Sequence, residues 1–107
     1  VDRAVAMPEQ IAGALFPDIG RWDAERFDAA FGMTKAPLMV VQTTYTNAAR
    51  QRVSLKVGES TPYLDDVRGK VPGARIEIIP GIGHFPQLET PQALNALLDD
   101  FLTGLPR

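Results

Sequence analysis

The residue best suited to chemistry in this chain is His84, the only histidine among 107 residues. It lies in the segment IPGIGHFPQLETP, residues 79–91, where a glycine on each side of Ile82 allows a tight turn and leaves the imidazole uncrowded. Imidazole is the side chain whose ordinary pKa suits proton transfer near neutral pH, so this position indicates a general base. The plain alternative is a loop histidine that is hydrogen-bonded to backbone.

Composition narrows the chemistry further. The chain has no cysteine, which excludes a disulfide scaffold, a thiolate zinc site and a thiol nucleophile, and a single histidine excludes a multi-histidine metal site. We therefore expect no metal and no cofactor. Its 11 Lys and Arg residues are interspersed with 13 Asp and Glu, and a net charge of −2 offers no basic surface for nucleic acid. No apolar run approaches the roughly 18 residues of a membrane span, and no signal peptide is visible, so we expect no membrane partner and a cytoplasmic location.

The first third of the sequence predicts two short helices. The first covers residues 7–16 and is stopped by Pro17, and the second covers residues 22–31, with Phe27 and Phe31 one turn apart. Helices of this length are marginal without tertiary contacts, so we expect both to pack on a larger body.

From residue 36 onward, strands alternate with helices. Residues 38–42 form a continuous apolar run opened by a proline, which is typical of a strand buried on both faces, and residues 74–79 form a second strand. Residues 43–47 continue with β-prone polar side chains, and a basic, irregular stretch follows at residues 50–57. This order predicts parallel strands covered by helices, and two strands alone make no stable sheet. We therefore expect further strands from another part of the protein.

The two helices of this region have clear start signals. Thr61 is an N-cap residue followed by Pro62 at the first helical position, and Thr90 precedes Pro91 in the same way. The second of these helices carries an amphipathic stripe with the spacing i, i+3, i+4, i+7, i+8. Its members are Leu94, Leu97, Leu98, Phe101 and Leu102.

The segment around His84 resembles the C-terminal part of the α/β-hydrolase superfamily. There the catalytic histidine follows the last strand in a Gly-x-Gly-His-aromatic loop, and a Glu-x-Pro pattern opens the last helix. The matching residues are Gly81, Gly83, His84, Phe85, Glu89 and Pro91. Upstream, residues 36–42 resemble the penultimate strand and residues 63–71 the helix between the two strands, so the resemblance covers residues 36–102.

This resemblance implies an α/β fold that is the C-terminal part of an α/β-hydrolase, with parallel strands and flanking helices, incomplete without the N-terminal part. Residues 1–35 would be the end of a helical cap and the helix leading into the sheet, and residues 36–107 the strand-helix-strand-helix segment. The partner would be the N-terminal remainder, in the same gene product or in a second chain. The isolated chain is then expected to be inactive.

The implied activity is that of a serine-type, esterase-like hydrolase with a small-molecule ester-like substrate, in which His84 is the general base. Neither Ser54 nor Ser60 lies in the Gly-x-Ser-x-Gly elbow that holds the nucleophile. Dehalogenases, epoxide-opening enzymes and lyases share the same ending, so these residues do not identify the substrate.

The triad acid is also absent from its usual place after the strand that ends at Gln42, where the sequence reads TTYTN. The superfamily offers one solution, an acid from the end of an earlier strand outside this chain. Alternatively Asn47 or Thr46 orients the histidine, or a downstream carboxylate reaches it. The downstream candidates are Glu59, Asp65 and Asp66.

Two other classes of function stay open. The chain could be a non-catalytic, hydrolase-like binding module, as the missing acid suggests, or a free-standing small α/β domain. Tyr45 and Trp22 are either pocket-lining or core aromatics. A cationic cluster is either a solvated loop or a partner surface, and it consists of Arg50, Arg52 and Lys56.

Overall fold

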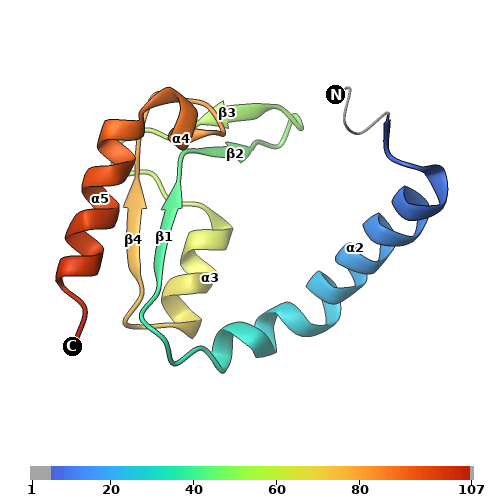
Figure 1. Cartoon of the computed structure of the whole chain (residues 1–107), viewed down its shortest axis with the longest axis horizontal. Coiled ribbons are helices and arrows are strands. Elements are labelled where there is room, and N and C mark those ends of the chain that lie inside the picture. Colours follow the sequence, from blue (N-terminus) through green and yellow to red (C-terminus); the bar gives the residue numbers. More distant parts are fainter. Residues whose placement is uncertain (1–5, 107) are drawn as a thin grey trace. The chain divides into compact units, whose positions relative to one another are not determined.

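The computed structural model describes residues 6–106, and the chain divides into two compact units (Figure 1). The N-terminal unit ends at Thr34 and the C-terminal unit begins at Lys35. The described residues have a mixed α/β fold with four helices and a parallel pair of strands. None of these helices combines the length and apolarity that a membrane span requires.

Among the described residues of the N-terminal unit, one continuous helix, α2 (Glu9–Gly32), covers the two segments for which we expected separate helices. Pro17 lies inside this helix and does not stop it. A proline lacks an N–H and so removes one hydrogen bond from a helix, but the residues on either side can keep helical geometry when their own bonds form. Phe27 and Phe31 lie one turn apart, as expected, and make a T-shaped contact with ring centroids 4.5 Å apart.

No residue of α2 is buried. Four of its large apolar side chains recur at intervals of three and four residues, which places them along one face of the helix. They are Ile11, Leu15, Ile19 and Trp22, each between 42% and 55% exposed. The expectation that this segment packs on a larger body stays a prediction.

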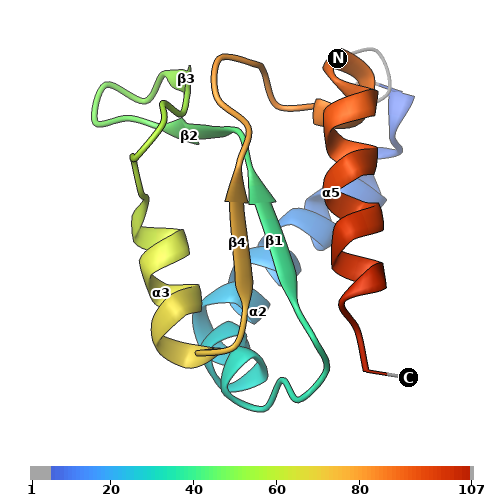
Figure 2. The same cartoon turned by 90° about the vertical axis from the view of Figure 1, so that its left-hand side faces the viewer.

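The C-terminal unit is organised around two parallel strands, β1 (Met39–Gln42) and β4 (Arg75–Ile78). Met39 pairs with Arg75 and Gln42 with Ile78, so the two strands end at the same level. Helices α3 (Pro62–Lys70) and α5 (Pro91–Thr103) lie on opposite sides of the pair (Figures 1 and 2). All four residues of β1 are half-buried, and in this pair each strand keeps one edge unpaired among residues 6–106; burial of β1 on both faces stays a prediction for a larger sheet.

The core of this unit lies between α3 and the strands. Leu64 and Val67 of α3 are fully buried, as is Leu55 just before the helix, and Val71 closes the set after it. The helix begins as predicted, because the Thr61 side chain accepts a hydrogen bond from the Leu64 amide at 3.2 Å. This cap satisfies one of the amides that the first turn leaves without a partner.

A hairpin that the sequence analysis did not predict extends from the end of β1. Strand β2 (Thr44–Thr46) pairs antiparallel with β3 (Arg52–Ser54), so the stretch that we interpreted as irregular contains a strand. In the turn, the Asn47 side chain accepts the amide of Gln51 at 3.0 Å, and Arg50 has a positive φ of 60°. A local side chain–backbone bond of this kind stabilises a turn without any glycine, which is why no turn signal was visible.

The short helix α4 (Pro86–Glu89) follows β4 and leads directly into α5. Thr90 begins α5, but its side chain makes no capping hydrogen bond, which corrects the prediction. The reason is local: Thr90 also ends α4, where its amide donates to Pro86, and its ψ of 61° is not the extended conformation of a capping residue. The stripe of α5 is only partly covered, since Leu98 is 40% and Leu102 61% exposed.

Candidate functional site

His84 lies on the loop between β4 and α4, here called the His84 loop (residues 79–85), beyond the carboxyl ends of β1 and β4 (Figure 1). The two glycines of the loop serve different purposes. Gly81 has a φ of 75°, a left-handed conformation that favours glycine. Gly83 faces the Glu89 carboxylate, one oxygen of which would lie 2.8 Å from an added Cβ. The loop therefore turns at Gly81 and packs closely at Gly83.

Three hydrogen bonds attach the His84 loop to the hairpin. The Thr43 hydroxyl donates to the Gly83 carbonyl at 2.6 Å, and the Ser54 hydroxyl donates to the Ile82 carbonyl at 2.6 Å. The Gly81 amide donates to the Leu55 carbonyl at 3.3 Å. Because Thr43 and Leu55 are buried, the base of the loop is fixed to the interior of the unit.

The imidazole itself is exposed, and its Nδ1 edge faces the hairpin. Arg52 Nη1 lies 3.2 Å from Nδ1 and donates to the Thr44 hydroxyl at 3.0 Å. Thr44 Oγ1 is 3.5 Å from Nδ1, at the outer limit of a hydrogen bond. The ring of Phe85 makes an edge contact at 5.0 Å and is 54% exposed. Nε2 has no partner among residues 6–106.

The contact with Arg52 fixes the roles of the two ring nitrogens. A guanidinium carries only donors, so Nδ1 must accept and the neutral imidazole must carry its proton on Nε2. A histidine that acts as a base in a triad has the opposite arrangement, with a proton on Nδ1 and a free lone pair on Nε2. In the arrangement seen here, the Nε2–H of His84 is a hydrogen-bond donor that faces solvent.

An open cleft of about 490 Å³ adjoins the imidazole. Its floor is the end of β1 and the start of β2, its far side is the N-terminus of α3, and Arg52 and His84 contribute its polar rim. Of the two interpretations of Tyr45, a pocket-lining or a core aromatic, the structure favours the first, because Tyr45 lines the cleft. Trp22 belongs to the other unit, where it contacts Phe27 at 6.0 Å between ring centroids.

None of the acids considered for His84 contacts the imidazole. The Glu59 carboxylate accepts the Lys56 amide, Asp65 pairs with Arg68, and Asp66 pairs with Lys70. Asn47 is used in the hairpin turn. Within the part of the chain that is described, the side chain that Nδ1 faces is Arg52, a cation, where a triad has a carboxylate.

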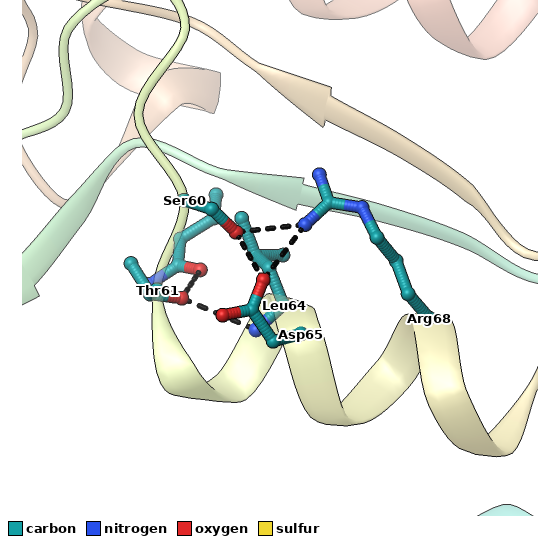
Figure 3. A network of polar contacts seen from close by, with 6 residues as sticks. Ser60, Thr61, Leu64, Asp65 and Arg68 are labelled. Atoms are coloured by element: carbon teal, nitrogen blue, oxygen red, sulfur yellow. Dashed lines mark hydrogen bonds and ion pairs between the residues drawn. The ribbon is translucent and has the colours of Figure 1, made fainter.

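The two serines are engaged in structural contacts. Ser54 holds the His84 loop, and Ser60 belongs to a polar network at the start of α3 (Figure 3). The Ser60 hydroxyl donates to Asp65 at 2.7 Å and accepts from Arg68 at 2.7 Å, beside the Thr61 cap (Figure 3). Neither serine lines the cleft, so neither is placed to act as its nucleophile.

We compared the chain with known protein families, with curated proteins and with solved structures. No match was found in any of the three. The assignment of a function therefore depends on the geometry of the cleft and on the resemblance of the loop sequence.

The sequence analysis singled out His84 but missed its neighbours. Arg52 was grouped with Arg50 and Lys56 as a loop cluster, whereas only Arg52 lines the cleft. The usable signal was the alternation Arg52-Val53-Ser54, which puts Arg52 and Ser54 on one face of a strand. No group of three or more potential metal-ligating side chains occurs in residues 6–106.

Proposed function

We propose that this chain supplies the general base, His84, of a serine-type α/β-hydrolase that acts on small ester-like molecules. The observation that carries the proposal is the position of His84: an exposed imidazole beyond the carboxyl ends of two parallel strands, at the rim of a cleft of about 490 Å³. In open α/β sheets, chemistry collects at this edge. The nucleophile and the acid would come from parts of the protein outside these residues.

The same geometry sets a condition for catalysis. To take a proton from a serine hydroxyl, Nε2 needs a free lone pair, so Nδ1 must carry the proton and donate it to a carboxylate. Arg52 must therefore turn away from Nδ1 when the acid is in place. The guanidinium is exposed and lies at the start of a three-residue strand, so it has room to do so.

The test is ester hydrolysis by the complete gene product that contains these residues. His84→Ala should lower kcat/KM by about 10²- to 10⁴-fold, the usual contribution of a general base, without unfolding the protein. Gln87→Ala is a suitable control, since Gln87 is exposed on α4 and lies outside the cleft lining. Undiminished hydrolysis by the His84 variant would refute the proposal.

A second candidate, a non-catalytic binding module, is favoured by one specific observation. The contact of Arg52 Nη1 with Nδ1, at 3.2 Å, makes Nε2 a donor and puts a cation where a triad needs an acid. A fluorophosphonate probe separates the two candidates, because it labels an activated serine covalently. Labelling of the complete gene product would support the hydrolase, and its absence would support the binding module.

A further inference from the structure

The Arg52 guanidinium has unused hydrogen-bonding capacity at the rim of the cleft. Arg52 Nη1 is engaged on the hairpin side, where it donates to Thr44 Oγ1 at 3.0 Å and lies 3.2 Å from His84 Nδ1. Nε and Nη2 have no partner among residues 6–106. This is an edge of the guanidinium with which arginine holds a carboxylate through two parallel hydrogen bonds.

The charge around the cleft is one-sided. Its lining includes Arg52 and contains no Asp or Glu. Three carboxylates of the unit are in ion pairs, Asp65 with Arg68, Asp66 with Lys70 and Glu77 with Arg75, and the Glu89 carboxylate faces Gly83. Arg52 forms no ion pair with any residue in the described range 6–106, so this permanent cation attracts an anion, and Nε2–H of His84 is a second donor that lines the same cleft.

The rest of the cleft lining combines apolar and aromatic side chains with Gln42 and four threonines, and its volume of about 490 Å³ suits a small organic molecule. Arginine at one end therefore selects for charge, and the walls select for a hydrocarbon or aromatic body. The apolar and aromatic lining residues are Val40, Val41, Tyr45, Pro62, Tyr63 and Pro86.

We propose that this cleft binds a small apolar carboxylic acid, whose carboxylate is held by the free Nε–Nη2 edge of Arg52 beside His84. The apolar body lies against the tyrosine and valine wall. Arg52 remains on Thr44 while the acid is bound, because the proposed contact uses hydrogens that the structure leaves unpaired. Binding does not require catalysis, and it uses the arrangement in which Arg52 contacts Thr44 and His84 Nδ1.

The experiment is a titration of the 107-residue chain with benzoate, followed by NMR shifts of the amides of Tyr45 and His84. Benzamide has the same ring without the charge, and acetate has the charge without the ring. We expect saturable shifts with benzoate, and binding at least about 10-fold weaker for each of the other two compounds.

Two variants test the role of Arg52. Arg52→Gln should weaken benzoate binding about 10- to 100-fold, the usual value of a hydrogen bond to a charged group. Arg52→Lys keeps the charge but not the paired donors and should fall in between. Arg50→Gln is the matched control: it removes the same charge from the exposed hairpin, outside the cleft lining, and should bind as the unmodified chain does.

Several results would overturn the proposal. These are the absence of saturable shifts with benzoate, equal affinity for benzamide or acetate, and an equal loss in the Arg50 and Arg52 variants. Amide spectra of each variant without ligand verify that the fold is retained. Because the titration needs no turnover, its result is independent of the serine-labelling test of the hydrolase.

Discussion

Helix α2 and the C-terminal unit both contain large apolar side chains, but these are mostly exposed in α2 and partly buried in a core in the C-terminal unit. In α2 no residue is buried, and Leu15 is 42% exposed. In the C-terminal unit, Leu64 is fully buried together with Leu55 and Val67. Leucine in α2 therefore contributes little to the stability of its own unit, whereas leucine in α3 holds the C-terminal unit together.

The difference determines where a functional site can be built. A side chain is held in one position when the backbone beneath it is fixed by buried contacts. The His84 loop meets that condition through Thr43 and Leu55, both buried. Within α2 no buried residue provides such a base. The candidate site is accordingly in the C-terminal unit.

The largest expected effect comes from truncating the same residue type in each region. Leu64→Ala should lower the free energy of unfolding of the C-terminal unit by about 3 kcal/mol, because it removes a fully buried side chain and leaves a cavity. Leu15→Ala should change stability by less than about 0.5 kcal/mol. Urea unfolding followed by amide NMR signals measures both. Equal effects would contradict the contrast between the two regions.

The next effect tests how the His84 loop is held. Thr43→Val keeps the shape of the side chain but removes the hydroxyl that donates to Gly83 at 2.6 Å. We expect a loss of about 2 kcal/mol from the unpaired carbonyl, and faster hydrogen exchange at the Gly81 amide. Thr46→Val, on the exposed part of the hairpin, is the matched control and should leave both quantities unchanged.

A smaller effect is expected for the glycine at which the loop turns. Gly81→Ala puts a Cβ on a residue with a φ of 75° and should cost about 1 kcal/mol in urea unfolding. Gly73→Ala is the comparison, since Gly73 lacks a positive φ and has open space around it. A stabilising Gly81→Ala change would show that this backbone conformation is not required.

The smallest effect concerns the link between β4 and α5. Arg75 contacts Glu77 and Asp100, both at 2.7 Å, and the hydrogen bonds to Glu77 and then Asp100 raise the pKa of Arg75 above its ordinary value. A group with a raised pKa stabilises the fold below its unfolded-state pKa and loses this contribution only as pH rises through the folded-state pKa. For an arginine this window lies at strongly alkaline pH.

Arg75→Gln should therefore cause a small loss in the free energy of unfolding. Because the guanidinium stays protonated across the neutral range, its contribution to this loss should not change with pH there. The loss should shrink in about 1 M salt, where the screening length is about 3 Å. The urea midpoint at low and high salt measures it. Asp18, which pairs with Arg21 at 3.4 Å on the surface of α2, provides the control variant Asp18→Asn, with a smaller effect still.

The parts of the fold that could be predicted are those with local signals. Thr61 and Pro62 marked the start of α3, and the run that ends at Gln42 marked β1. The hairpin was missed because its turn is made by Asn47 and a positive φ at Arg50, without glycine. Continuity of α2 through Pro17 was missed because a proline's cost depends on the bonds around it.

The candidate site was predicted only in part for a related reason. His84 could be found because its loop has a distinctive sequence. Arg52 is 32 residues away, and its contact with Nδ1 at 3.2 Å follows from the pairing of the hairpin and its bonds to the loop. Contacts between distant segments leave no local pattern in the sequence.

The central claim is that His84 is the general base of a hydrolase, and the most direct measurement is its effect on a covalent active-site label. The complete gene product that contains these residues is treated with a fluorophosphonate, with and without His84→Ala. We predict labelling of one serine in the unmodified protein and a rate at least about 10²-fold lower in the variant. Equal labelling of both proteins, or no labelling of either, would contradict the claim.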